Sequence, residues 1–330
     1  MLYPLKFEKV FKEKIWGGRK LESLLNMNLP QNINIGESWE VSCHPNGMSV
    51  VENGELKGRS LESLLFEYKE KLVGKEVYKK YQNKFPLLIK YLDVNDKLSV
   101  QVHPSDKYAL EVEKEFGKSE CWYIMDASEN AKLIMGLKKE ITKEIFMEKV
   151  SNKDFSNLFN EITVKKGDFI NVNPGLVHAT LEGSVVICEV QQNSDTTYRI
   201  YDFDRKVDGQ LRPLHLEKAS EVINFNEEPQ ISKEEDRKNI EIENGKKQHL
   251  VKTEYFIVDK VKINGSFKKN VSDSFTILSI LDGNGKIISS NKEYFISKGD
   301  TWFIPSNIEI EIDGDLELLE SCVEGEIKLS

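Results

Sequence analysis

The sequence has few cysteines and no long apolar run. Its cysteines, Cys43, Cys121, Cys188 and Cys322, lie far apart and form no CxxC pair, which argues against a structural zinc knuckle. We expect them to be reduced core residues. No apolar stretch reaches the roughly eighteen residues of a transmembrane helix, so none is predicted. The first residues are interspersed with charges and lack the apolar segment of a signal peptide, so we expect a cytoplasmic protein.

An excess of positive charge is also missing. The 330 residues include 46 Lys and Arg against 55 Asp and Glu, for a net charge of −9, which argues against a general nucleic-acid binder. A small anion can still bind, because a local pocket can be positive in an acidic protein. Neither a GxxxxGK[ST] segment nor a GxGxxG turn occurs, so nucleotide binding is not indicated. The expected partners therefore exclude nucleic acid and membranes.

Short alternations of apolar and polar residues, typical of β-strands, cover most of the chain. Residues 56–82 instead carry apolar side chains at spacings of three and four, which predicts a helical stretch interrupted near Gly74. A second helical segment is predicted at 139–160, with Thr142 as a candidate N-cap. These patterns predict a mainly β fold with some helices.

One β-unit occurs twice. Lys166-Gly167-Asp168 and Lys298-Gly299-Asp300 each precede an apolar strand that ends at a proline. The first copy continues with Gly175 and His178, whereas the second copy has Ser306 and Asn307 and no histidine. We therefore expect an active first barrel and a degenerate, structural second barrel.

The polar stretch 226–247 is the best candidate for a linker, although it could also wrap back on the first unit. We expect a catalytic domain over residues 1–235, with the helical segments as insertions, and a smaller β domain over residues 236–330. The repeated unit predicts two β-barrels.

The segment Leu98–Pro104 places a glutamine and a histidine two residues apart. On a strand, Ser99, Gln101 and His103 project to one face, while Leu98, Val100 and Val102 project to the other. Gln101 and His103 could then share one metal ion. A solvent-facing polar edge is the alternative for this segment taken alone.

His178 follows a sharp turn at Pro174-Gly175. The proline fixes the bend and the glycine permits positive φ, so His178 would re-enter the barrel at a set height. This spacing resembles the second motif of the cupin superfamily, where a metal-binding histidine recurs. A lone core histidine is the alternative.

Glu120 begins an otherwise apolar strand, where a buried carboxylate needs a partner. A divalent cation would serve, although a solvated strand end is equally compatible with this segment. Gln101, His103, Glu120 and His178 together offer nitrogen and oxygen donors without thiolate. Such a set suits zinc, and also manganese, cobalt or iron.

The chain resembles the short bacterial type I mannose-6-phosphate isomerases (phosphomannose isomerases) of the cupin superfamily. The resemblance covers about the first two-thirds and is carried by Tyr3-Pro4-Leu5, Ile15-Trp16-Gly17-Gly18, Gly36-Glu37-Ser38-Trp39, Pro86-Leu87-Leu88-Ile89-Lys90, QVHP, GKSECWY, NPGLVHAT and SDTTYR. It implies that Gln101, His103, Glu120 and His178 bind one divalent metal, with zinc expected first. It also implies that the two β-barrels are cupin-like jelly rolls, and that the chain interconverts mannose 6-phosphate and fructose 6-phosphate through a cis-enediolate.

The resemblance implies further roles at the same site. Arg199, in Ser194-Asp195-Thr196-Thr197-Tyr198-Arg199, aligns with the family's catalytic arginine, although Thr196 and the ending Tyr198-Arg199-Ile200 depart from the usual pattern. Glu189 resembles a family acid near the substrate, and Lys118 matches a family lysine. Lys118, Ser99 and Arg199 are candidate substrate-binding residues, and Asp195 or Glu189 could be the base.

Several alternatives remain open at this point. A metal-dependent oxygenase or a non-catalytic sugar-binding protein could use the same barrel, and Arg199 and Glu189 could simply pair with each other. Gln101, Lys118 and Arg199 favour an anionic sugar over dioxygen. We expect a sugar phosphate as the substrate, and a monomer or a weak homo-oligomer.

Overall fold

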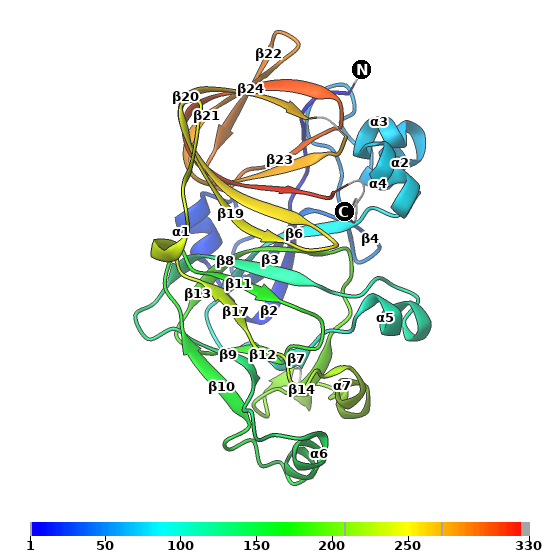
Figure 1. Ribbon diagram of the computed structural model, residues 1–330, viewed down its shortest axis with the longest axis vertical. Helices are drawn as coiled ribbons and strands as arrows, with labels where there is room; N and C mark the ends of the chain where they lie inside the picture. Colours follow the sequence, from blue (N-terminus) through cyan, green and yellow to red (C-terminus); the bar gives the residue numbers. More distant parts are fainter. Residues whose placement is uncertain (1, 208, 272, 325–330) are drawn as a thin grey trace.

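The computed structural model describes residues 2–207, 209–271 and 273–324, and β-strands form most of it (Figure 1). One half of the molecule holds two sheets that face each other. The seven-stranded sheet has the order β17 (Gln230–Ser232), β11 (Phe169–Val172), β8 (Glu120–Ala127), β13 (Val185–Gln192), β6 (Leu87–Val94), β3 (Ile35–Val41) and β2 (Val10–Gly18). The five-stranded sheet has the order β10 (Phe159–Thr163), β9 (Lys132–Leu137), β12 (His178–Glu182), β7 (Val100–Val102) and β14 (Tyr198–Tyr201).

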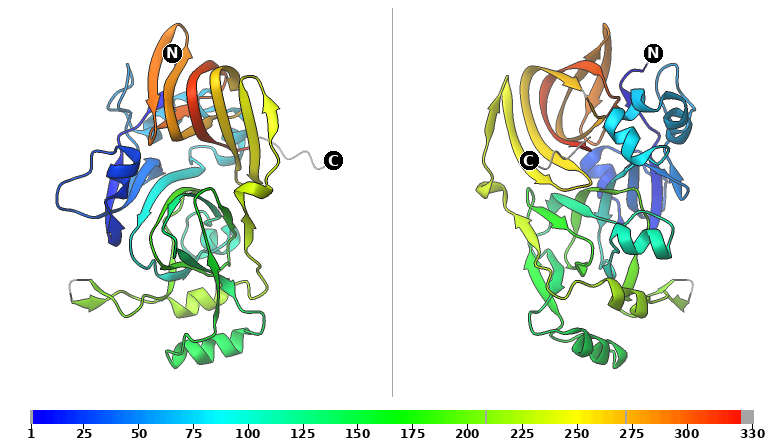
Figure 2. Two further views of the ribbon diagram at one scale, coloured as in Figure 1. Left: turned by 90° about the vertical axis from the view of Figure 1, so that its left-hand side faces the viewer. Right: turned by 45° about the vertical axis from the view of Figure 1, so that its right-hand side comes forward.

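The other half of the molecule is an eight-stranded antiparallel sheet that curves around its own core (Figures 1 and 2). Its main path is β1 (Leu5–Lys6), β23 (Thr301–Ile304), β21 (Thr276–Ser289), β24 (Ile308–Cys322), β20 (Ile257–Val271), β19 (Gly245–Lys252) and β18 (Ile240–Ile242), with β22 (Lys292–Ser297) paired to β21. The first strand of the chain thus belongs to the sheet of the C-terminal half. The predicted domain division at residue 235 stays a prediction.

Helices and two short hairpins complete the fold. The hairpins are β4 (Cys43–His44) with β5 (Gly47–Met48), and β15 (Lys206–Val207) with β16 (Gln210–Leu211). The helices are α1 (Lys20–Leu25), α2 (Leu61–Tyr68), α3 (Glu70–Val73), α4 (Lys75–Tyr81), α5 (Asp106–Val112), α6 (Lys143–Ser151), α7 (Leu216–Val222) and the 3₁₀ turn η1 (Glu234–Asp236). None of these described helices is long and apolar enough to cross a membrane.

The predicted fold class is confirmed: the chain is mainly β and its paired sheets are of the jelly-roll kind. Within the described residues, however, each sheet is open at its edges, so neither half is a closed barrel.

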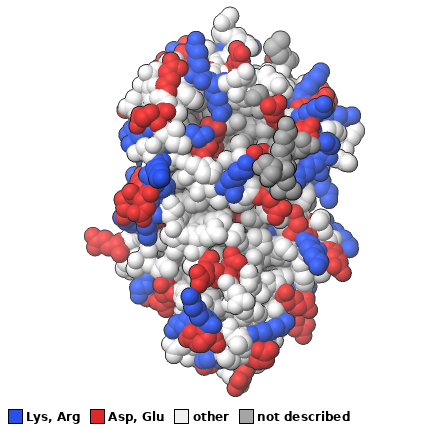
Figure 3. Space-filling model, in the orientation of Figure 1, with Lys and Arg blue, Asp and Glu red and all other residues white. Residues whose placement is uncertain are grey.

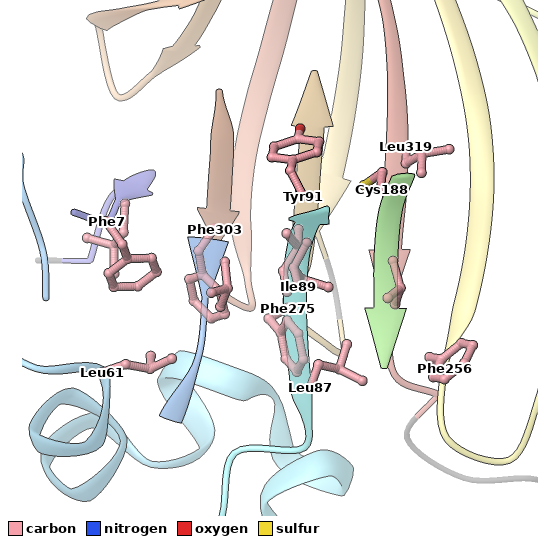
Figure 4. Close-up of a cluster of buried hydrophobic side chains, with 14 of the residues drawn as sticks. Phe7, Leu61, Leu87, Ile89, Tyr91, Cys188, Phe256, Phe275, Phe303 and Leu319 are labelled. Atoms are coloured by element: carbon pink, nitrogen blue, oxygen red, sulfur yellow. The ribbon is translucent and has the colours of Figure 1, made fainter. Parts of the chain in front are cut away.

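The seven-stranded sheet is buried on both faces, and this explains its composition. In β6, Leu87, Ile89 and Tyr91 pack toward the eight-stranded sheet in the core shown in Figure 4. The alternate residues, including Lys90 and Leu92, face the opposite way and line a pocket. A strand that is buried on both faces is normally a continuous run of apolar residues. Lys90 departs from this pattern, and its buried charge needs a specific partner.

The repeated KGD turn has the same geometry in both copies. Gly167 and Gly299 have φ values of 92° and 86°, a region that disfavours any side chain. Each following aspartate accepts a backbone hydrogen bond from the residue three before it, at 3.0 Å for Asp168 and 2.9 Å for Asp300. The sequence similarity therefore reports a real structural repeat.

The two predicted helical segments, 56–82 and 139–160, agree with the structure to different degrees. The interruption near Gly74 is confirmed, because Gly74 has φ 96° and separates α3 from α4. The second segment is shorter than the predicted 139–160: α6 ends at Ser151, and the chain then reaches β10 through a loop with positive φ at Lys153 and Asn157. It also begins later than residue 139, at Lys143, but the predicted N-cap is confirmed, since the Thr142 side chain accepts the Ile145 amide.

The first part of the polar stretch 226–247 wraps back on the first half instead of forming a free linker, whereas its last residues belong to β18 and β19 of the eight-stranded sheet. Its strand β17 pairs with β11 through Ser232 and Phe169, and η1 follows it directly. Lys233 reaches Asp168 of the first KGD turn at 2.7 Å. The stretch therefore closes one edge of the seven-stranded sheet.

Charges of both signs are intermixed over the face shown in Figure 3. Exposed pairs of this kind, such as Lys139 with Glu228, contribute only about 0–1 kcal/mol each. The cysteines are free, with Cys121 and Cys188 buried in the core as expected and Cys43 and Cys322 partly exposed.

Candidate metal centre and active-site pocket

Three buried side chains from different strands converge on one point. His103 follows β7, Glu120 begins β8 and His178 begins β12. The His103 and His178 Nε2 atoms lie 3.5 and 3.4 Å from the two Glu120 carboxylate oxygens. The three ligand atoms lie within 4.8 Å of one another. This is the one His, Cys, Asp and Glu cluster of such compactness within the described residues.

Both histidines are held in one orientation by the backbone. His103 Nδ1 lies 3.0 Å from the Thr196 carbonyl, and His178 Nδ1 lies 2.9 Å from the Leu176 carbonyl. A neutral imidazole with its proton on Nδ1 leaves the Nε2 lone pair directed at the centre, as a metal ligand requires. Burial favours this neutral form, because it lowers the pKa of His178 to about 3 and that of His103 well below its usual range.

Glu120 is the unusual member of this cluster. Its side chain is fully buried, and neither carboxylate oxygen accepts a hydrogen bond from the described residues. Burial raises the pKa of Glu120 to about 7, against the opposing effect of the nearby Lys118 ammonium. A buried carboxylate without hydrogen bonds is costly, and a divalent cation would satisfy it. The residues present therefore fit a metal with nitrogen and oxygen ligands.

Gln101 lies beside this cluster because of strand register. It is the β7 partner of His178 on one side and of Arg199 on the other, so the three residues form a row across β12, β7 and β14. Gln101 Nε2 lies 3.3 Å from His178 Nε2. Turning the amide by half a turn would direct its oxygen, the metal-binding atom, to the same point.

The predicted face of the Ser99–His103 segment is largely confirmed. Val100 and Val102 are buried in an apolar core, while Gln101 lies on the pocket side. Leu98 is the exception. It lies outside β7 and lines the pocket instead of joining the valines.

The Pro174-Gly175 turn ties two of the candidate ligands together. Gly175 has φ 91°, and its amide donates to the His103 carbonyl at 2.9 Å. A Cβ atom at Gly175 would lie 3.0 Å from the backbone of Asn224 and Val222. Glycine is therefore required both by the turn and by the packing.

A cavity of about 270 Å³ opens beside the cluster. Its lining includes every predicted substrate-side residue: Ser99, Gln101, Lys118, Glu189, Asp195 and Arg199. Tryptophans and charged side chains form much of the remaining wall: Lys14, Trp16, Glu37, Lys90, Trp122 and Arg212. Such a cavity suits a small polar ligand.

Known proteins resemble the whole chain. The family model of the type I phosphomannose isomerase catalytic domain matches residues 4–136, and that of the mannose-6-phosphate isomerase cupin domain matches residues 246–323. Mannose-6-phosphate isomerase from Streptococcus mutans is 40% identical over 323 residues, covering 97% of this chain and 98% of that protein. The chain belongs to the type I phosphomannose isomerase family.

Further relatives agree with this assignment to an isomerase family. The probable mannose-6-phosphate isomerase GmuF of Bacillus subtilis is 41% identical over 324 residues, covering 97% of this chain and 99% of that protein. A crystal structure of mannose 6-phosphate isomerase from Bacillus subtilis has a TM-score of 0.87 at 36% identity, covering 97% of this chain and 99% of that chain. A phosphomannose isomerase structure from Salmonella typhimurium, with a TM-score of 0.76 at 15% identity, shares the fold.

The isomerase holds Glu189 in a buried ion-pair network. Lys90 Nζ lies 3.3 Å from Glu189 Oε1 and 3.9 Å from Glu37, while Trp122 Nε1 donates to Glu189 Oε2 at 2.8 Å. Register explains this grouping, because Trp122, Glu189, Lys90 and Trp39 are successive partners across β8, β13, β6 and β3. The alternative of a mutual pair between Glu189 and Arg199 is therefore wrong.

Lys118 and Arg199 approach the pocket of this isomerase from opposite sheets. Lys118 Nζ lies 3.3 Å from both His103 Nε2 and Glu120 Oε2. Arg199 donates from Nη1 to the Pro213 carbonyl at 2.8 Å, and its buried Nε has no hydrogen-bond partner in the described part of the chain. His215 anchors the Arg199 backbone, accepting its amide at 3.0 Å and donating to its carbonyl at 2.7 Å.

Sequence reasoning missed several pocket residues of the isomerase. Lys90 and Glu37 occur in the motifs of the family resemblance, but no role was predicted for them, and Arg212 and Lys14 were not named as candidates. One signal was available: Lys90 interrupts the apolar run of β6. A lysine at a position buried on both sides of the sheet indicates a paired charge. The partners of Lys90 come from other strands, so they could not be identified from the residues next to it in the sequence.

Proposed function

We propose that this isomerase holds one divalent metal with His103, Glu120 and His178, with Gln101 as a fourth ligand. It would interconvert mannose 6-phosphate and fructose 6-phosphate by moving a proton between C1 and C2 through a cis-enediolate. The observation that carries the metal is Glu120, whose buried oxygens accept no hydrogen bond from the described residues and face two Nε2 atoms.

Zinc is the first metal to test. Two imidazoles and one carboxylate are the three protein ligands common in catalytic zinc sites, and with the Gln101 amide oxygen and a substrate oxygen the ion would be five-coordinate, an expansion that zinc allows. A bound divalent cation supplies Lewis-acid polarisation of the substrate carbonyl.

The side chains around this centre support the rest of the reaction. Lys118, which is 5% exposed, lines the pocket beside the candidate ligands, so its ammonium can donate to a substrate oxygen. Ser99 lines the same wall, with Oγ 3.2 Å from Gln101 Oε1, and after the half-turn of the amide its hydroxyl oxygen would accept a hydrogen bond from Nε2 instead. Arg199 adds a permanent cation for an enediolate or phosphate oxygen.

Glu189 and Asp195 are the proposed proton carriers. Both line the pocket, Glu189 held by Lys90 and Trp122, and Asp195 accepting a hydrogen bond from Asn46 at 2.9 Å. The base is the residue whose amide variant, Glu189→Gln or Asp195→Asn, loses exchange of the substrate C2 proton with deuterated water. Retained exchange in both variants would contradict a carboxylate base.

The C-terminal half, residues 236–330, is proposed to be structural. After its KGD turn and proline this half has Ser306 and Asn307 and no histidine, whereas the first copy has Gly175 and His178 after its proline. The described residues of this half contain no cluster like that of His103, Glu120 and His178.

A coupled assay of fructose 6-phosphate formation tests the proposal. Activity should disappear after chelation and return with zinc, while oxygen consumption stays at background. A chelated protein of undiminished activity would contradict the metal, and substrate-dependent oxygen consumption would favour the oxygenase.

A further inference from the structure

A cluster of guanidinium groups forms one end of the pocket. Arg212 Nε lies 2.7 Å from Asp202 Oδ2, and Arg212 Nη2 contacts Asp202 Oδ1. Arg205 Nη2 contacts the same carboxylate at 2.6 Å, and Asp202 is only 4% exposed. Two arginines therefore share one buried carboxylate, and a third, Arg199, lies close enough for its pKa to be lowered by burial and then by Arg212.

This cluster has more positive than negative charge on its pocket side. Arg199 and Arg212 both line the cavity, and Arg199 forms no salt bridge in the described ranges. The carboxylate of Asp195, also in the lining, accepts a hydrogen bond from Asn46 and lies beyond salt-bridge distance of either arginine. The buried Nε of Arg199 has no acceptor. An anionic ligand would supply the missing acceptor.

The position of the cluster matches the shape of the substrate. His178, Gln101 and Arg199 are register partners on adjacent strands, so Arg199 lies two strands, or roughly 10 Å, from His178. A hexose 6-phosphate carries its reacting carbons and its phosphate at opposite ends. With C1 and C2 at the metal centre, the C6 phosphate points along this row toward the arginines.

We propose that Arg212, together with Arg199, binds the phosphate group of the substrate, and that Asp202 positions Arg212 for this role. The proposal rests on the proposed function, because it takes a sugar phosphate as the ligand. Asp202 contacts the Nε and Nη2 edge of Arg212, which leaves Nη1 for a phosphate oxygen. A planar guanidinium held in this way loses little freedom on binding.

The cluster also connects the pocket to an exposed hairpin. Arg212 follows β16 directly, and the β15–β16 hairpin projects from the body of the molecule at the lower left of the left-hand view of Figure 2. Lys206 lies on β15, is exposed and is absent from the pocket lining. Lys206→Gln therefore removes one positive charge from the same hairpin without touching the pocket, and serves as a matched control.

The test compares Arg212→Gln with Lys206→Gln in the metal-loaded protein. Arg212→Gln should raise the KM for mannose 6-phosphate and the inhibition constant of inorganic phosphate by about tenfold or more, with kcat changed by less than about threefold. Metal content should stay at one equivalent. Asp202→Asn should change both constants in the same direction by a smaller factor, since the arginine remains but loses its anchor.

If Arg212→Gln and Lys206→Gln have the same KM for mannose 6-phosphate and the same inhibition constant for inorganic phosphate, the proposal is overturned. Circular dichroism and the thermal midpoint check folding, and Arg212→Lys, which keeps the charge but loses the planar fork, is the second variant if Arg212→Gln does not fold. It should give an intermediate KM. Calorimetric titration with inorganic phosphate separates this proposal from the proposed function: phosphate binding that is lost in Arg212→Gln supports the subsite even if the wild-type protein does not isomerise mannose 6-phosphate.

Discussion

Lys90 and Glu189 form a salt bridge in which each side chain is 4% exposed, with Nζ 3.3 Å from Oε1. The two residues are register partners on β6 and β13, so their side chains leave the sheet on the same face. Burial alone would lower the pKa of Lys90, but Glu189 and Glu37 outweigh it, and the pKa lies above its usual range. The ammonium therefore stays charged in the pocket wall.

Lys90→Met should destabilise the protein by about 3–5 kcal/mol, because it leaves the buried Glu189 carboxylate without its cation. Urea unfolding of the two proteins at neutral pH measures the difference. The double variant Lys90→Met/Glu189→Gln removes both charges and should recover part of the loss. A single variant as stable as wild type would show that the pair carries no such energy.

His178→Ala should abolish metal retention and isomerase activity while the chain stays folded. The substitution removes one of two imidazoles that face Glu120, and the remaining donors are too few to hold a divalent ion tightly. Elemental analysis after gel filtration gives the metal content, and circular dichroism checks the fold. His249→Ala is the control, because His249 pairs with Asp259 in the C-terminal half. A His178→Ala protein with full metal content would rule out this ligand.

The stabilising contribution of Glu37 should be lost in acid, because its pKa is lower in the folded protein than in the unfolded chain. Burial would raise its pKa, but Lys90 and Lys14, with a hydrogen bond from Trp39, lower it from 4.5 to about 2. The folded state thus binds this proton less readily than the unfolded chain. The contribution of Glu37 to stability is complete above pH 4.5 and is lost as the pH falls toward 2, by at most about 3 kcal/mol.

Glu37→Gln isolates this contribution. The variant should be less stable than wild type at about pH 6, and the difference between them should shrink toward about pH 3. Urea unfolding across this range measures both curves, and the other titrating groups are common to the two proteins. A difference that does not change with pH would contradict the depressed pKa of Glu37.

His215→Leu should lower kcat/KM by about tenfold, because it removes the imidazole Nδ1 that accepts the Arg199 amide and leaves only the backbone hydrogen bond from His215 N to the Arg199 carbonyl. The metal content should be unchanged, since His215 lies outside the cluster of candidate ligands. His215→Asn, whose amide oxygen can accept the Arg199 amide, should recover part of the activity. Equal kinetics in wild type and His215→Leu would show that Arg199 does not need this anchor.

Local patterns were enough to predict much of the site. The Pro174-Gly175 turn before His178 and the alternation around Gln101 and His103 are short-range features that depend on φ limits and the two-residue period of a strand. Both features are present in the folded protein: Gly175 has positive φ, and Gln101 lies on the pocket side. The 139–160 helix was less well predicted, because α6 ends at Ser151 and the residues after it are divided between a loop and β10.

Strand register decided what local patterns could not. Trp39, Lys90, Trp122 and Glu189 come from four strands and meet only because these strands pair in one order. The Asp202–Arg212 contact likewise depends on the path between β14 and α7. The spacing of residues within one segment does not show which residues of other segments lie beside them in the folded protein.

The sequence by itself determined the mainly β class and the repeated turn, which depend on backbone geometry and residue chemistry within a few positions. It also carried the family resemblance, which implied the candidate ligands Gln101, His103, Glu120 and His178. Only the tertiary structure decided that Glu120 accepts no hydrogen bond from the described residues, that Glu189 pairs with Lys90 instead of Arg199, and that arginines gather at one end of the pocket. The physical reason is that burial and charge pairing depend on what lies across the sheet, which the order of residues along the chain does not state.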